Sequence, residues 1–144
     1  MIVQQIMKSK SAGGVATIAP AAGLDAAVAA MAERRIGALV VSRTGADVEG
    51  IVSERDIVRE LAVRGPACLG RTVGEVMTRA IVTCAPADTA QSVLERMTAG
   101  RFRHMPVLEG GEMVGLISIG DVVKARLDEL GAEMDALEGM IKGF

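Results

Sequence analysis

Two serine-x-x-aspartate segments are the residues of this sequence best equipped to bind a ligand. Ser53-Glu54-Arg55-Asp56 and Ser118-Ile119-Gly120-Asp121 each follow an apolar stretch of strand length and open a helical pattern. An ionised carboxylate can accept hydrogen bonds from both hydroxyls of a ribose, and a helix N-terminus offers free N–H groups to phosphate. The two segments therefore indicate a site for a sugar phosphate.

The same spacing is also that of a helix cap. A serine can accept a hydrogen bond from the N–H three residues on, and the acid can return a bond to the serine N–H. The two roles can coexist, with Ser53 and Ser118 capping their helices in the empty state.

Basic side chains precede the strand expected over residues 104–108, which a Gly110-Gly111 turn joins to a second strand over 113–118. Arg103 can fork onto phosphate oxygens, and His104 helps most when it is protonated. The alternative is a solvated rim in which Arg101, Arg103 and His104 guard an edge strand.

The chain repeats itself, which predicts a tandem duplication. Each copy has the pattern of a strand, a helix, two strands and a second helix. The matched segments are 17–21 with 83–87, 50–58 with 115–123, and the leaders 3–7 with 73–77.

The pattern predicts an α+β fold. One such unit is too small to bury both faces of its sheet, so we expect the copies, 1–65 and 66–126, to pack sheet against sheet about a pseudo-twofold axis. Two related clefts then form at their junction. The expected first strands are 15–18 and 81–83, the later strands are 38–42, 48–53, 104–108 and 113–118, and the first buried helix face carries Leu24, Val28 and Met31.

The segment 127–144 predicts a continuing C-terminal helix. Its apolar residues follow the spacing of a coiled-coil seam, so we expect this helix to pack on the body or on a second subunit. The alternative is a frayed amphipathic tail. The seam residues are Leu127, Leu130, Met134, Leu137 and Ile141.

Composition argues against several classes of function. A net charge of −2 and only two aromatic residues give no footprint for nucleic acid. Cys68 and Cys84 have no CxxC spacing, and one histidine cannot complete a zinc site with them, so no metal is expected and a reducing cytoplasm is favoured. No apolar run approaches the ~20 residues of a membrane span. No nucleophile–base pair or carboxylate dyad indicates an enzyme.

Taken together, the motifs resemble those of the cystathionine-β-synthase (CBS) domain pair, also called a Bateman module, over residues 1–126. The shared features are the leaders, the Thr-x-x-Pro turns, the strand His104-Met105-Pro106-Val107, and the two segments Gly50 to Val58 and Gly115 to Val123. Each motif is weak alone, whereas their order, found twice at matching offsets, is specific.

The resemblance implies a regulatory module without catalysis. It would bind an adenosine-containing ligand between the copies, with AMP first and ATP, ADP, NAD(H) or S-adenosylmethionine as alternatives. The resemblance also implies a disc-like homodimer and a separate regulated protein that the sequence does not name. A ligand-free scaffold module is the competing function, although the paired Ser-x-x-Asp segments favour ligand binding within this family pattern.

Each site residue is implied by its matching position in the family motif. Asp56 and Asp121 would contact ribose, and the first strands near Thr17 and Thr83 would line adenine. The phosphate contacts would be Ser53, Arg55, Ser118, Arg103 and His104.

On physical grounds, an adenine without aromatic partners needs an aliphatic clamp. The clamp and cleft-lip candidates are Ile18, Val52, Val82, Met105, Ile117 and Pro106, together with Gly37 at the start of the matching strand of the first copy. Because that strand, 37–41, has neither proline nor cation, we expect the Asp121 cleft to bind firmly. The Asp56 cleft should bind more weakly or share a dinucleotide.

Overall fold

The structure is a computed structural model that describes residues 1–10 and 14–143. Its elements follow the duplicated pattern, with short helices added at the leaders. The helices are α1 (Val3–Ser9), α2 (Leu24–Arg34), α3 (Glu54–Arg64), the 3₁₀ turn η1 (Pro66–Gly70), α4 (Val73–Val76), α5 (Ala90–Gly100) and α6 (Ile119–Ile141). The strands are β1 (Thr17–Ile18), β2 (Ala38–Val41), β3 (Gly50–Ser53), β4 (His104–Glu109) and β5 (Glu112–Ser118).

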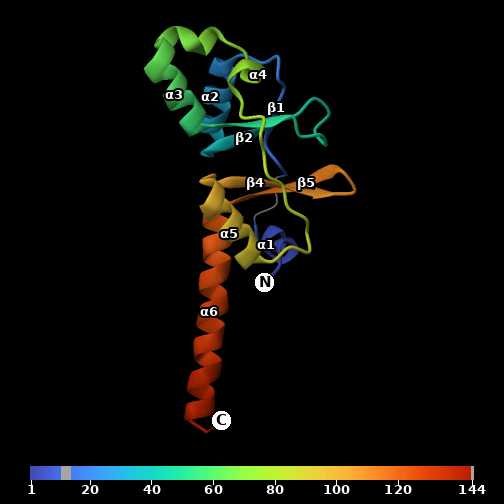
Figure 1. The fold of residues 1–144 in the computed structure, drawn as a ribbon, viewed down its shortest axis with the longest axis vertical. Coiled ribbons are helices and arrows are strands. Elements are labelled where there is room, and N and C mark those ends of the chain that lie inside the picture. The colour runs from blue at the N-terminus through green and yellow to red at the C-terminus, as the bar shows by residue number, and fades with distance from the viewer. Residues whose placement is uncertain (11–13, 144) are drawn as a thin grey trace.

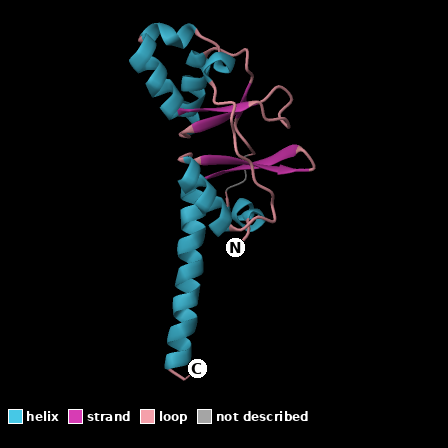
Figure 2. Cartoon of the chain, in the orientation of Figure 1, coloured by secondary structure: helices cyan, strands magenta, loops and turns pink. Residues whose placement is uncertain are grey.

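Two sheets face each other in the middle of the molecule (Figure 1). In the first, β1 pairs parallel to β2 and β2 pairs antiparallel to β3; in the second, β4 pairs antiparallel to β5. Helices α2, α3 and α4 lie beyond the first sheet, and α1, α5 and the start of α6 lie beyond the second (Figure 2). The predicted α+β fold, with two repeats packed sheet to sheet, is confirmed.

Each leader packs in the core of the other repeat. Val3 and Ile6 of α1 are buried among residues of the second repeat, and Val73 and Met77 are buried in the first core. Backbone hydrogen bonds fix the exchange: Val3 N donates to Asp88 O (2.8 Å), and Val73 N donates to Ala22 O (2.8 Å). The two repeats are therefore interlocked, and a division of the chain between residues 65 and 66 separates each leader from the core in which it packs.

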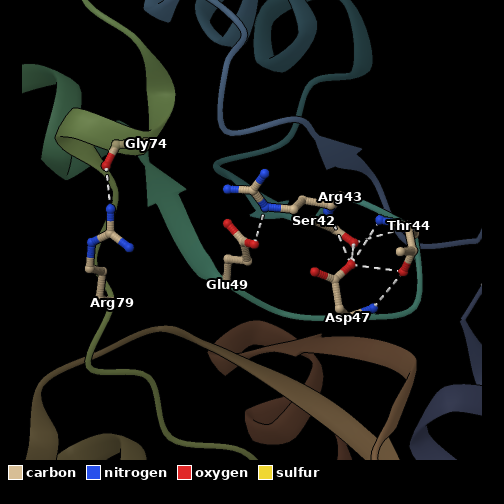
Figure 3. Close-up of polar contacts among 8 residues, drawn as sticks. Ser42, Arg43, Thr44, Asp47, Glu49, Gly74 and Arg79 are labelled. Atoms are coloured by element: carbon tan, nitrogen blue, oxygen red, sulfur yellow. Dashed lines mark hydrogen bonds and ion pairs between the residues drawn. The ribbon is translucent and has the colours of Figure 1, made fainter.

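The β2–β3 turn contains the extra residue of the first repeat and is closed by one carboxylate. Asp47 Oδ1 accepts hydrogen bonds from Ser42 Oγ (2.6 Å) and from the backbone N–H groups of Arg43 (3.0 Å) and Thr44 (2.9 Å) (Figure 3). These bonds hold the pKa of Asp47 well below its usual range. An Arg43–Glu49 ion pair ties the two ends of the turn together.

Two details differ from the predicted elements. Residues 81–83 form no strand; only an isolated parallel bridge between Cys84 and Val107 marks the expected position. The buried face of α2 carries Ala27 in place of Val28, which is 36% exposed. At about 100° per residue, residues 27 and 28 lie equally far from the line through Leu24 and Met31, on opposite sides of it, so the spacing alone does not choose between them.

Helix α6 continues past the body as predicted, but its apolar seam is not covered by the body. The seam residues from Leu127 to Ile141 are all exposed, and the helix extends away from both sheets (Figure 1). Residue 144, the last of the predicted segment, lies outside the described residues. Within 1–10 and 14–143, no helix is both long and apolar enough to cross a membrane.

Candidate functional site: two inter-repeat clefts

A cleft of about 500 Å³ opens beside Asp56, and we call it the Asp56 cleft. Its lining includes Ser53 and Asp56 at the start of α3, and Ile81 and Val82 from the first-strand position of the second repeat. Four arginines, Arg55, Arg59, Arg101 and Arg103, line the same cleft against two carboxylates, Glu54 and Asp56. Cations therefore outnumber carboxylates in the lining of this cleft.

The second cleft, of about 540 Å³, lies beside Asp121 and is built from the equivalent parts with the repeats exchanged. Ser118 and Asp121 come from the second repeat, while Val15 and Ala16 come from the first-strand position of the first repeat. We call it the Asp121 cleft. Both volumes fall within the ~300–1,000 Å³ typical of small-molecule sites.

Both aspartates close a capping box. Ser53 N donates to Asp56 Oδ2 (2.9 Å), and Ser118 N donates to Asp121 Oδ2 (2.9 Å). In return, Ser118 Oγ accepts from Asp121 N at 3.1 Å, and Ser53 Oγ accepts from Asp56 N at 3.4 Å. The capping interpretation is confirmed, and each aspartate still borders a cleft, so the cap does not remove the carboxylate from a ligand's reach.

Equivalent backbone hydrogen bonds in the two repeats fix the position of each Ser-x-x-Asp motif relative to its sheet. Glu54 N donates to Gly37 O (3.0 Å), and Ile119 N donates to Arg103 O (2.8 Å). Each helix start is thereby tied to the beginning of the middle strand of its own repeat. Gly37 and His104 consequently line both clefts.

Gly50 and Gly115, three residues before Ser53 and Ser118, each lie where a leader segment crosses the strand. A Cβ on Gly50 would lie 2.7 Å from Thr78 O, and a Cβ on Gly115 would collide with the Met7 sulfur. Ile51 and Thr78 also exchange two backbone hydrogen bonds, of 3.0 and 2.8 Å. At Gly50 the obstacle is a backbone carbonyl, so only glycine allows the leader to approach this closely; at Gly115 the obstacle is the flexible Met7 side chain.

Lys10 occupies the Asp121 cleft together with the carboxylate. Its Nζ lies 2.9 Å from Asp121 Oδ2 and donates to Leu116 O at 2.7 Å. Burial alone would raise the pKa of Asp121, but the Ser118 N–H and Lys10 together hold that pKa below its ordinary value. The carboxylate is therefore ionised and already paired.

His104 is a neutral side chain between the clefts. Burial is the main cause that lowers the pKa of His104, and the Lys10 charge lowers it further, against the opposing charges of Asp121 and Glu54. We expected His104 to serve phosphate as a cation. The structure instead gives it the character of an uncharged hydrogen-bonding group.

The cations are distributed differently from the sequence expectation. Arg103 was assigned to the Asp121 cleft, yet it lines the Asp56 cleft with Arg55 and Arg101. Arg55 Nη1 donates to Arg101 O (3.3 Å), which links α3 to the segment that precedes β4. Arg101 and Arg103, which precede β4 of the second repeat, thus line the cleft of Asp56, which belongs to the first repeat. The Asp56 cleft is therefore the more cationic of the two.

Several predicted adenine contacts lie outside both clefts. Side chains alternate along a strand, so the neighbours of Ser53, His104 and Ser118 point to the opposite face. Val52, Met105 and Ile117 are accordingly buried in the helix-covered cores. The remaining predicted residues that line neither cleft are Thr17, Ile18, Thr83 and Pro106; Val82 lines the Asp56 cleft as predicted.

Sequence reasoning missed Lys10, Arg59 and Thr78 as cleft residues. Thr78 Oγ1 donates to Asp56 Oδ1 at 3.2 Å. The leader repeat held a usable signal, because the third residue after the leader methionine is Lys10 in one copy and Ala80 in the other, and both line a cleft. Arg59 follows Arg55 by one helical turn and so shares its face.

Comparison with known proteins agrees with this geometry. The family model described as CBS domain matches residues 3–63 and again 73–128. The CBS domain-containing protein CBSX3, mitochondrial, of Arabidopsis thaliana is 36% identical over 121 residues. That alignment covers 81% of this chain and 59% of the relative, so the chain spans less than two thirds of that protein's length.

Solved structures show the same arrangement. The CBS-domain containing protein ATU1752 from Agrobacterium tumefaciens is 40% identical, with a TM-score of 0.83 and coverage of 88% of this chain and 99% of that one. The CBS domain pair of protein MJ0100, solved in complex with 5′-methylthioadenosine and S-adenosyl-L-methionine, has a TM-score of 0.75 at 20% identity. It covers 90% of this chain and 98% of that chain, and at this identity it shows the fold.

Proposed function

The chain belongs to the CBS domain family, with two copies of the domain in tandem, and on this premise we propose that it is a regulatory module that binds an adenosine nucleotide in the Asp56 cleft. The observation that carries the proposal is the convergence of Asp56 and four arginines on one cleft. The carboxylate is an acceptor for ribose hydroxyls, and guanidinium groups are suited to phosphate oxygens.

Charge favours the phosphorylated members of the ligand class. Four guanidinium groups against two carboxylates attract AMP, ATP or NADH, whereas the sulfonium of S-adenosylmethionine adds a positive charge to a cationic cleft. The MJ0100 domain pair is solved with adenosine compounds that carry no phosphate. The charge of the Asp56 cleft therefore predicts a different preference within the same ligand class.

The base would lie against aliphatic walls. Ile81 and Val82 line the cleft, and Phe102, between Arg101 and Arg103 in the sequence, adds one aromatic side chain. Ile51, from β3, lines the cleft as well. Apolar surface of this kind can hold a planar base, while the polar groups fix its orientation.

The ligand would act by shifting the population of one arrangement of the repeats over another. Both clefts are lined by residues of both repeats, so a bound nucleotide contacts the two halves at once. A ligand shifts such an equilibrium only by its difference in affinity for the two states. A separate regulated protein, or the oligomer itself, would receive the change.

Titration calorimetry of nucleotide-stripped protein against AMP, ATP, NADH and S-adenosylmethionine tests the proposal. We expect saturable binding of at least one phosphorylated ligand and weaker binding of S-adenosylmethionine. No heat from any of the four ligands would support the competing function, a ligand-free scaffold module.

A further inference from the structure

The half of α6 that leaves the body carries an apolar stripe. Figures 1 and 2 show this part of the helix beyond both sheets. The stripe residues, each between 40% and 85% exposed, are Val123, Leu127, Leu130, Met134, Leu137 and Ile141. Leaving so much apolar surface in water on one helix face is typical of an interaction site.

The stripe is separate from the face by which α6 joins the body. Val122 and Ala125 are buried against the second core. At about 100° per residue, the centre of the stripe lies roughly 100° around the helix from Val122 and roughly 160° from Ala125. A second helix can therefore lie along the stripe while α5 keeps its place on the body-facing side.

The stripe is complementary to itself when one copy is reversed. Its spacings of four, three, four, three and four residues read the same from either end. We propose that α6 pairs with α6 of a second copy of this chain as an antiparallel coiled coil. In this register every stripe residue meets an apolar partner: Val123 meets Ile141, Leu127 meets Leu137, and Leu130 meets Met134, each pair occurring twice.

Charges beside the stripe favour the antiparallel orientation. That orientation places Lys124 beside Glu138 of the second copy at both ends of the pair, which gives two attractive contacts. The one repulsive contact is that of Glu133 with Glu133 of the second copy. A parallel pair would place Glu133 beside Glu138 twice and would give Lys124 no acidic neighbour. Gly131 meets Gly131 at the centre of the antiparallel pair, where the absence of side chains allows close approach.

This assembly leaves both clefts open. Asp121, the α6 residue that lines a cleft, lies roughly 160° around the helix from the centre of the stripe, so the second helix would lie on the other side. The two bodies would lie at opposite ends of the helix pair, in contrast to a flat disc. The inference is independent of the proposed ligand.

Disulfide trapping of mixed variants tests the orientation directly. The native Cys68 and Cys84 are buried in the body, so new thiols on α6 can be followed separately. Leu130→Cys and Met134→Cys proteins are oxidised alone and as an equal mixture. The antiparallel register predicts covalent dimers in the mixture only. Like positions are offset by four residues, about 6 Å along the helix axes, and this offset combined with the sideways separation of the two helices exceeds the ~7 Å limit for Cα atoms.

Cross-linking of either variant alone would show a parallel pair, and no cross-linking in the mixture would show that the stripe does not pair. Either result overturns the proposal.

Sedimentation of Leu130→Glu gives a second measure of the pairing. We expect this variant to form a smaller assembly than the wild type. The matched Ala132→Glu change, on the opposite side of the same exposed helix, should leave the assembly unchanged. Equal behaviour of the two variants would contradict the pairing.

Discussion

The Nζ atom of Lys10 lies 2.9 Å from Oδ2 of Asp121, inside the cleft that the second Ser-x-x-Asp segment lines. A ligand that uses Asp121 for its ribose must share this carboxylate with Lys10 or displace it. Among the described residues, Asp56 has no corresponding ion pair; it accepts a hydrogen bond from Thr78 Oγ1 instead. The two clefts, similar in outline, therefore differ in the state of their central acceptor.

Removing the Lys10 charge should change the protonation of Asp121. In Lys10→Met we expect the pKa of Asp121 to rise toward its ordinary value, because a hydrogen bond and a favourable charge are lost. Carbon-13 NMR of the carboxyl groups during a pH titration measures this shift. The control is Lys8→Met on the neighbouring exposed lysine. An unchanged Asp121 titration would mean that the ion pair does not persist in solution.

The leader exchange predicts that a change in the first residues weakens the second repeat. Ile6 is 2% exposed in the second core, so Ile6→Ala should lower the free energy of unfolding by about 2–5 kcal/mol. Urea unfolding measures the loss, and Gln4→Ala, at an exposed position of α1, is the control. In hydrogen exchange, β4 and β5 should lose protection before β2 and β3. The reverse order would contradict the exchange.

The order of elements could be predicted from the sequence because hydrophobic periodicity and the repeat agree with each other. The exchange of the leaders could not, because it depends on long-range contacts such as those of Val3 and Ile6, which no local pattern encodes. The strand predicted at 81–83 is absent. Its position forms only the bridge of Cys84 with Val107, although its residues match the β1 region of the first copy.

His104 predicts a pH dependence of stability near neutrality. Its folded-state pKa lies below the ordinary value of about 6.5, so the unfolded chain binds more protons just below that pH. Stability should therefore be full above about pH 6.5 and should fall as the pH drops below it. The charged groups facing His104 are Lys10, Arg103, Asp121 and Glu54.

Thermal unfolding between pH 8 and pH 5.5 measures this dependence, and His104→Gln should flatten it. The carboxylates whose pKa values are lowered release their stabilisation at lower pH and so lie outside this window; they are Asp47, Asp88, Asp121 and Glu129. A variant with the same slope as the wild type would show that His104 is not the responsible group.

The arginines of the Asp56 cleft predict a dependence on phosphate. Arg103→Ala should weaken ATP binding about tenfold or more, as expected for the loss of charged hydrogen bonds, and should change adenosine binding much less. Competition of unlabelled ATP and adenosine against a fluorescent nucleotide measures both affinities. Arg34→Ala, at the exposed end of α2, is the matched control. Equal losses for ATP and adenosine would argue against a phosphate contact.

The site residues show where sequence reasoning succeeds and where it fails. The Ser-x-x-Asp motifs line both clefts, because a strand followed by a helix fixes the position of the aspartate locally. Arg103 was assigned to the wrong cleft because its side chain serves the aspartate of the other repeat, which only the packing of the two sheets determines. Met105 and Ile117 were assigned to the ligand because the alternation of strand faces could not be anchored without knowing which face carries the helices.

The most direct test of the central claim is calorimetric titration of Asp56→Asn with ATP, beside Asp25→Asn as the control. Asp25 is also an acid in the first turn of a helix, but it lines neither cleft. We predict that Asp56→Asn weakens ATP binding by about tenfold or more while its melting temperature stays close to that of Asp25→Asn. Unchanged ATP affinity in a folded Asp56→Asn protein would contradict the assignment of the Asp56 cleft as the nucleotide site.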